Sequence, residues 1–163
     1  MSTFYDKPVS QYKDKTITAI RLFGSAIPAS NVFHWCLSLT LDEVESFIIV
    51  DPTPTVDLKI VVMMSTGSYN GSPNEGGAYQ TDVAQALTVS DLKALIMEKK
   101  RDRYKLDDSG SGCRYWCQIV LGDLEDGGFV TPGTTAQFLT TIDALAAKNP
   151  EGFPLPVRKG TFY

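Results

Sequence analysis

The chain has 163 residues, close to the roughly 150 residues of a typical domain, and we expect one domain over 1–163. Its composition, 43% hydrophobic and 21% charged, is typical of globular proteins. The net charge of −4 argues against nucleic acid or an anionic membrane as a partner, because such binding depends on basic surfaces. No apolar run reaches the roughly 18 residues of a membrane span, and 1–15 is too polar for a signal peptide, so we expect a soluble, cytoplasmic protein.

The first half of the chain predicts β-structure after a polar segment, 1–14, that we expect to be loose. Alternating or β-branched residues predict strands joined by short turns over 15–23, 32–41, 46–51 and 57–64. Pro52 and Pro54 are expected to break the third strand. Such a series favours an antiparallel meander. The glycine-rich stretch 65–82 then predicts a long polar loop, either a lid or a mobile surface insert.

The second half of the chain predicts helices. Apolar residues recur at helical spacing over 90–101 and 135–148, and most clearly over 113–124, before Gly127 and Gly128. A short strand is expected at 104–106, followed by a turn-forming loop over 107–112. We therefore expect an α+β fold, with a curved antiparallel sheet of about four or five strands and the helix from Cys113 packed against it.

The predicted strand 32–41 has two different faces. Because side chains alternate along a strand, Phe33, Trp35, Leu37, Leu39 and Leu41 share one face, which is a core face. The other face holds His34, Cys36, Ser38 and Thr40. His34 is the only histidine of the chain, so any imidazole base must be this residue.

Cys113 stands in the first turn of a predicted helix, directly after a glycine-serine loop. Helix starts leave backbone N–H groups unpaired and positively polarised, which favours a thiolate nucleophile, and the Cys113 N–H could hold an oxyanion. His34 is the candidate base. The alternative is that Cys113 is inert and buried, because Cys113 and Cys117 both lie on the apolar stripe. We interpret Cys36 and Cys117 as packing residues, and three cysteines do not suggest a disulfide framework.

The motifs FHWCLSL at 33–39 and Cys113-Arg114-Tyr115-Trp116 resemble those of circularly permuted papain-like proteins. These include the lecithin:retinol acyltransferase-like proteins and the PPPDE-type thiol peptidases, in which a His-Trp strand precedes a helix-opening cysteine. The resemblance implies a permuted papain-like (NlpC/P60-like) arrangement with Cys113 and His34 as catalytic residues. The asparagine that precedes the family's cysteine is Gly112 here. The run from His34 to Tyr163 also resembles small uncharacterised proteins of filamentous fungi, which implies a context in natural-product biosynthesis.

In the permuted families the strand after the histidine supplies a third group that orients the imidazole. Glu45, Ser46 and Asp51 are the candidates here, and their spacing does not choose among them. We name Asp51 as the catalytic candidate because its carboxylate can accept an imidazole N–H, although an aspartate before a proline is also common at strand ends.

Further side chains are candidates for binding a substrate. Arg114, next to the cysteine, could contact an anion, as could Arg101 or Arg103 from the basic run 98–105, which otherwise complements a helix end. Trp35, Trp116 and the loop residue Tyr69 could supply aromatic contacts. A zinc site of His34, Cys36, Cys113 and Cys117 is the metal alternative, but the spacing lacks the usual cysteine knuckles, and we expect neither metal nor cofactor.

The leading hypothesis is a thiol-dependent hydrolase or acyl/amide transferase that acts on a small metabolite or peptide-like substrate. The alternative is a non-covalent small-molecule binding protein, or a cyclase/isomerase-like protein of a biosynthetic pathway, that uses the same cleft. A third possibility is a catalytically dead papain-like module, which predicts that His34 and Cys113 lie too far apart for proton transfer.

Overall fold

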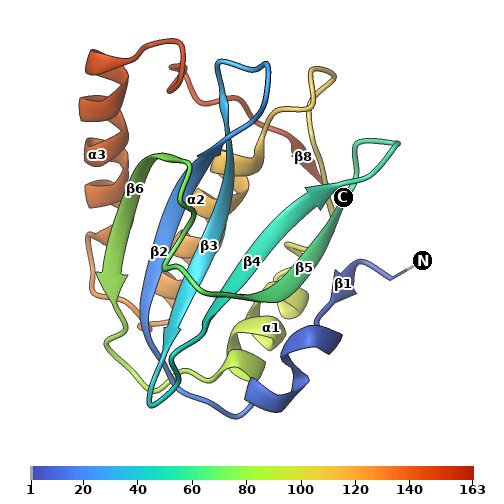
Figure 1. Ribbon diagram of the computed structural model, residues 1–163, viewed down its shortest axis with the longest axis vertical. Coiled ribbons are helices and arrows are strands. Elements are labelled where there is room, and N and C mark those ends of the chain that lie inside the picture. Colours follow the sequence, from blue (N-terminus) through green and yellow to red (C-terminus); the bar gives the residue numbers. More distant parts are fainter. Residues whose placement is uncertain (1) are drawn as a thin grey trace.

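The computed structural model describes residues 2–163 and contains a six-stranded sheet in the order β1-β5-β4-β3-β2-β6 (Figure 1). The strands are β1 (Phe4–Tyr5), β2 (Ile17–Ala26), β3 (Phe33–Leu41), β4 (Phe47–Pro54), β5 (Ile60–Gly67) and β6 (Glu75–Asp82). Neighbouring strands are antiparallel except β1 and β5, which are parallel. The predicted α+β class and the antiparallel meander from β2 to β5 are confirmed, and the sheet is larger than expected.

The helices pack on one side of this sheet (Figure 1). They are α1 (Val89–Glu98), α2 (Cys113–Asp126) and α3 (Thr134–Lys148), with the 3-10 helix η1 (Lys7–Tyr12) beside β5. Two short strands, β7 (Tyr104–Lys105) and β8 (Thr161–Phe162), form a separate pair near the C-terminus. The predicted helices over 113–124 and 135–148 are confirmed, because their apolar stripes are buried against the sheet and each other.

The N-terminal segment is more ordered than its polar sequence predicts. β1 adds a parallel edge strand to β5, and Phe4 and Val9 lie in the hydrophobic core. The expectation of a loose segment over 1–14 therefore does not hold for residues 4–12. The few apolar side chains of this segment are sufficient to hold it in place because they pack into a core that is formed mainly by the rest of the chain.

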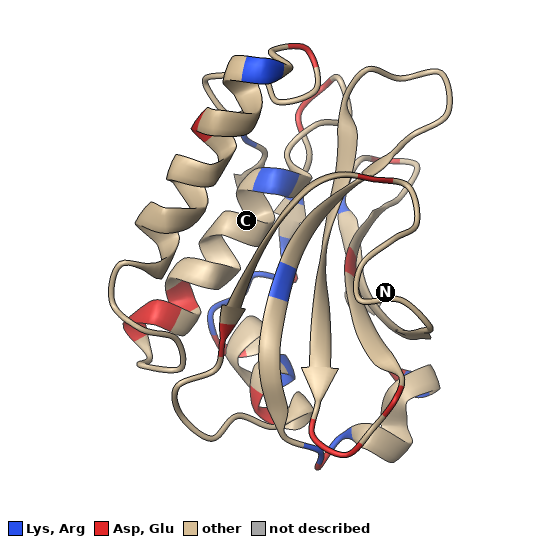
Figure 2. Cartoon of the chain, turned by 60° about the vertical axis from the view of Figure 1, so that its left-hand side comes forward, with Lys and Arg blue, Asp and Glu red and all other residues tan. Residues whose placement is uncertain are grey.

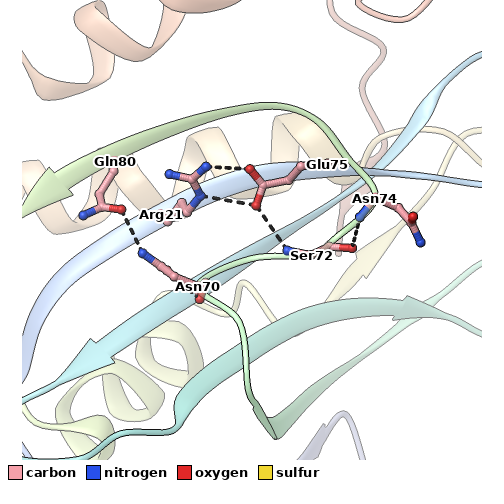
Figure 3. Close-up of polar contacts among 7 residues, drawn as sticks. Arg21, Asn70, Ser72, Asn74, Glu75 and Gln80 are labelled. Atoms are coloured by element: carbon pink, nitrogen blue, oxygen red, sulfur yellow. Dashed lines mark hydrogen bonds and ion pairs between the residues drawn. The ribbon is translucent and has the colours of Figure 1, made fainter.

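The stretch 65–82 is not one long loop. β5 extends to Gly67 and β6 begins at Glu75, so only residues 68–74 connect them, and this crossover runs across the sheet face opposite the helices (Figure 1). Figure 3 shows how polar side chains hold it there. Asn70 accepts a hydrogen bond from Ser38 of β3 and donates one to Gln80 of β6, both at 3.0 Å. Glu75 forms a bidentate ion pair with Arg21 of β2.

β3 and β4 separate towards the start of β3 and the end of β4. Their ladder pairs only 37–39 with 48–50 and then stops (Figure 1). The Thr55 N–H donates to the Lys59 carbonyl, on the β5 side. Successive residues of a strand direct their backbone groups to opposite sides, so the nitrogens of Pro54 and Pro52 face β3. A proline nitrogen carries no hydrogen, so β4 cannot continue the ladder to β3. The prediction that Pro52 and Pro54 break this strand is therefore wrong, because β4 continues to Pro54. Instead, the two prolines open a split between β4 and β3.

No helix within residues 2–163 is long and apolar enough to cross a membrane. Basic and acidic residues are interspersed along the chain (Figure 2).

Candidate functional site

The backbone around Gly112 places Cys113 at the first residue of α2. Gly112 is the N-cap residue and has φ of +134°, a conformation that side chains strongly disfavour. A Cβ atom there would also lie 2.8 Å from the Tyr104 hydroxyl and 2.9 Å from the Gly160 nitrogen. The asparagine of the permuted papain-like pattern would not fit this turn. Within residues 2–163, no side chain caps the start of α2, so its first N–H groups stay available to a ligand.

The buried Tyr104 hydroxyl fixes the loop that carries the cysteine. It donates a hydrogen bond to the Gly112 carbonyl at 2.9 Å and accepts one from the Gly160 N–H at 2.7 Å. β7 and the C-terminal segment thus clamp the residue before Cys113. No sequence pattern points to this role of Tyr104 or Gly160, because the three residues are brought together only by the pairing of β7 with β8.

The Cys113 thiol lies at the edge of β3 that the split leaves without a strand partner. Its Sγ accepts a hydrogen bond from the Trp35 N–H at 3.3 Å and lies 3.9 Å from the Phe33 carbonyl oxygen. These two backbone groups flank His34. The thiol therefore takes the place that a β4 backbone carbonyl would have in a continuous ladder, and the missing N–H of Pro52 makes this position possible.

The His34 ring is held by Asp51 of β4. His34 Nε2 and Asp51 Oδ1 are 2.7 Å apart, and both side chains are only partly exposed. Because Nε2 binds the carboxylate, Nδ1 is the ring nitrogen left to exchange a proton with a thiol. Glu45 and Ser46, the other predicted candidates for orienting the ring, precede the first residue of β4, whereas Asp51 lies within the strand. Of the three residues among which the spacing does not choose, Asp51 is the one that contacts the ring.

The electrostatic surroundings favour a charged His34. Burial works against the imidazolium, but the hydrogen bond to Asp51 and the neighbouring Cys113 and Cys36 thiols raise the pKa of His34 well above its ordinary value. The two other thiols differ from Cys113, which is partly exposed, because they are buried. Burial raises the pKa of Cys36 to about 11 and that of Cys117 well above its ordinary value. Both should stay as neutral thiols near pH 7.

A small cleft of about 80 Å³, partly open to solvent, lies beside this group. Its walls come from the end of β2 and the start of β3, from the loop 110–112 with the start of α2, and from the segment 152–158. His34 and Cys113 both line it. This geometry disagrees with the prediction of a dead module in which the two residues are far apart.

The predicted substrate-binding residues have different positions. Arg114 and Trp35 line the cleft, although Trp35 is only 2% exposed and packs against Phe138 and Phe153. Trp116 is completely buried and donates its indole N–H to the Arg101 carbonyl, so it does not reach the cleft. Tyr69 is 61% exposed on the crossover, at the other face of the sheet, and does not line the cleft. Arg101, the alternative anion contact, is already paired with Asp123.

A metal could be held by only part of the predicted zinc set. The ligand atoms of His34, Cys36 and Asp51 lie within 4.8 Å of one another, whereas Cys117 is not in this group of described residues. The 2.7 Å contact between His34 and Asp51 is a hydrogen-bond distance, and the high pKa of Cys36 opposes the thiolate that a metal needs. The arrangement fits a hydrogen-bonded pair of His34 and Asp51 better than a metal centre.

Comparison with known proteins gives a family but no activity. Residues 23–163 match the family model described as a domain of unknown function, DUF7770. The matched range includes the cysteine, the histidine, the aspartate and every segment that lines the cleft. No curated protein and no solved structure matches the chain. The chain therefore belongs to the DUF7770 family.

Proposed function

We propose that this protein is a thiol-dependent hydrolase or acyl/amide transferase that acts on a small metabolite or peptide-like substrate. The observation that carries the proposal is that Cys113 and His34 line one cleft while Asp51 holds the His34 ring. Three separate elements, α2, β3 and β4, supply these residues, and the only imidazole of the chain has a carboxylate on one side and the thiol region on the other.

In the proposed reaction, the Cys113 proton already resides on His34 in the resting site, and the resulting Cys113 thiolate attacks a carbonyl carbon of the substrate. The imidazolium is stabilised by Asp51, in line with the raised pKa of His34. The uncapped N–H groups at the start of α2 would hold the oxyanion. His34 then returns the proton to the leaving group, and water or an acceptor nucleophile releases the acyl group from sulfur.

The chain order and the packing support a permuted papain-like arrangement as part of this proposal. The histidine strand precedes the cysteine helix, α2 packs against β3, and the strand that follows the histidine strand supplies the carboxylate. The resemblance to small fungal proteins supports natural-product precursors as substrates.

Alkylation by iodoacetamide near neutral pH, mapped by mass spectrometry, tests the nucleophile. We expect rapid labelling at Cys113, whereas the buried Cys36 and Cys117 serve as internal controls in the same molecule and stay unlabelled. Equal labelling of the three cysteines, or none at Cys113, would contradict the proposal.

Turnover is tested with p-nitrophenyl acetate, an activated ester. We expect a burst of p-nitrophenolate and an acetylated Cys113, and both should be lost in Cys113→Ala and strongly reduced in His34→Gln. A matched variant, Cys117→Ala, which removes a buried thiol that does not line the cleft, should keep the burst. If Cys113→Ala retains full activity, the thiol mechanism is excluded.

The second candidate is a non-covalent binding protein or a cyclase/isomerase-like protein that uses the same cleft. It is favoured by the apolar side chains Ile27, Val32, Phe33 and Val157 in the lining, which could hold a nonpolar ligand without the thiol. It predicts that Cys113→Ala keeps ligand affinity or activity, so this variant separates the two functions.

A further inference from the structure

The cleft contains a charged side chain that the proposed thiol chemistry does not use. Arg114, the residue after Cys113, is 8% exposed and lines the cleft. Its Nη2 donates a hydrogen bond to the Pro154 carbonyl at 2.7 Å, and no carboxylate within residues 2–163 forms an ion pair with it. A guanidinium has five N–H donors, so most of its donors and its charge are left for another partner.

The two other arginines that are partly buried each have a carboxylate partner within the protein. Arg21 holds Glu75 and Arg101 holds Asp123, each through two hydrogen bonds. Arg114 is more deeply buried than either and lacks a carboxylate partner. A buried charge without a counter-ion is costly, so its retention calls for a partner from outside the chain.

The position of Arg114 in its helix adds a second unfavourable effect. It stands in the first turn of α2, where the helix dipole presents positive charge and disfavours a cation. Burial also lowers the pKa of Arg114, and only the charge of Cys113 opposes that shift. An anion bound to the Arg114 guanidinium would relieve both effects.

Within residues 2–163, the rest of the cleft lining also carries positive and no negative side chains. Arg158 also lines it, near its exposed rim, and contacts Ser111. No aspartate or glutamate is among the described residues that line the cleft, although the chain as a whole has a net charge of −4. The remaining walls are largely apolar. The cleft therefore combines positive charge near Cys113 with a nonpolar surface.

We propose that the substrate is a small acyl compound with an anionic group, a carboxylate or a phosphate, which Arg114 binds beside the reacting carbonyl while its nonpolar part lies against the apolar wall. This inference rests on the proposed function and specifies its substrate class. Arg158, at the rim, would assist the entry of the anion.

Alkylation of Cys113 with a charged and a neutral reagent tests the inference without a known substrate. We measure the rate of alkylation by iodoacetate divided by the rate of alkylation by iodoacetamide. This ratio should be larger for Cys113 than for glutathione, which serves as the reference thiol without a binding site. Arg114→Gln should lower the ratio at Cys113 by about tenfold, because a hydrogen bond to a charged group is lost. Arg114→Lys should retain part of the preference, and Arg103→Gln, an exposed arginine outside the cleft, should leave it unchanged.

Protection experiments separate the anion types. Hexanoate and inorganic phosphate are each tested as protectants of wild-type Cys113 against iodoacetamide, with hexanol as the neutral control. Protection by hexanoate alone indicates a carboxylate with a nonpolar chain, whereas protection by phosphate indicates a phosphorylated substrate. Neither anion should protect the Arg114→Gln protein.

The outcomes distinguish the two levels of the proposal. Rapid alkylation of Cys113 without preference for iodoacetate, and with equal protection by hexanol, overturns the anion site but leaves the thiol mechanism intact. Lack of reaction at Cys113 with either reagent overturns the proposed function itself. If Arg114→Gln does not fold, the iodoacetate preference and anion protection of the wild-type and Arg114→Lys proteins still decide the question.

Discussion

At the scale of single residues, the contact between His34 and Asp51 determines the charge of the ring. Asp51→Asn removes the carboxylate but keeps a side chain of similar shape. Burial still disfavours the imidazolium in this variant, but the hydrogen bond to a carboxylate no longer stabilises it. We therefore expect the pKa of His34 to fall from its raised value to or below the ordinary 6.5. Because His34 is the only histidine, its proton NMR signal is free of overlap with other histidines, and its pH titration measures this shift directly.

The same variant should change how stability depends on pH. A group with a raised pKa in the folded state stabilises the protein fully below its unfolded pKa of about 6.5 and loses this effect as the pH rises towards the folded value. The free energy of unfolding of wild type relative to Asp51→Asn should therefore be larger at about pH 6 than at about pH 9. Urea denaturation at the two pH values measures the difference, and an equal difference at both would contradict the assigned cation.

The Tyr104 hydroxyl is the second residue whose role can be isolated. In Tyr104→Phe, the Gly112 carbonyl and the Gly160 N–H lose their shared partner, and we expect the free energy of unfolding to fall by about 1–3 kcal/mol. Alkylation of Cys113 should also slow, because the loop before it is less constrained. Tyr115→Phe is the matched control on α2, since no side-chain hydrogen bond of Tyr115 occurs within residues 2–163. A Tyr104→Phe protein as stable as this control would exclude the clamp.

At the scale of elements, the split between β3 and β4 is what admits the thiol. Pro52→Ala supplies an N–H that faces β3, and the ladder could then continue to Trp35. The Trp35 N–H would turn from the Cys113 sulfur to the carbonyl of residue 52. We expect slower alkylation of Cys113 in this variant, measured with iodoacetamide.

Pro54→Ala is the matched control for this experiment. It makes the same chemical change on the same side of β4, one residue pair farther from Trp35, and should affect Cys113 less. Equal alkylation rates in wild type, Pro52→Ala and Pro54→Ala would show that the prolines do not determine access of the thiol to β3.

At the scale of the whole molecule, the two faces of the sheet are covered by different parts of the chain. The helices bury one face and present Cys113, whereas the crossover 68–74 covers part of the other through Asn70 and the Arg21–Glu75 pair (Figure 3). Glu75→Gln weakens this pair, whose side chains are 28% and 18% exposed, and should lower the free energy of unfolding by about 1–2 kcal/mol.

This loss of stability should leave the site unchanged. Cys113 approaches from the helix side, and two strands separate β6 from β4, so we expect the same alkylation rate at Cys113 in Glu75→Gln as in wild type. Glu45→Gln, at an exposed position, is the control for stability and should change it by less than about 0.5 kcal/mol. A Glu75→Gln protein with altered Cys113 reactivity would show that the two faces are coupled.

The sequence by itself determined the features that depend on local periodicity. The alternation of Phe33 to Leu41 and the apolar stripe from Cys113 are visible because backbone geometry repeats every two residues in a strand and every 3.6 in a helix. The same periodicity located Cys113 in a first helical turn and made His34 the only possible imidazole partner.

Only the tertiary structure decided which distant residues meet. It chose Asp51 over Glu45 and Ser46, paired Arg101 with Asp123 but left Arg114 without a carboxylate, and brought Tyr104 and Gly160 to the cysteine loop. It also converted most of the expected loop 65–82 into strand, because β6 finds its partner in β2 across the sheet. Such contacts join residues far apart in the chain, and their free energies depend on pairing and burial that no local pattern encodes.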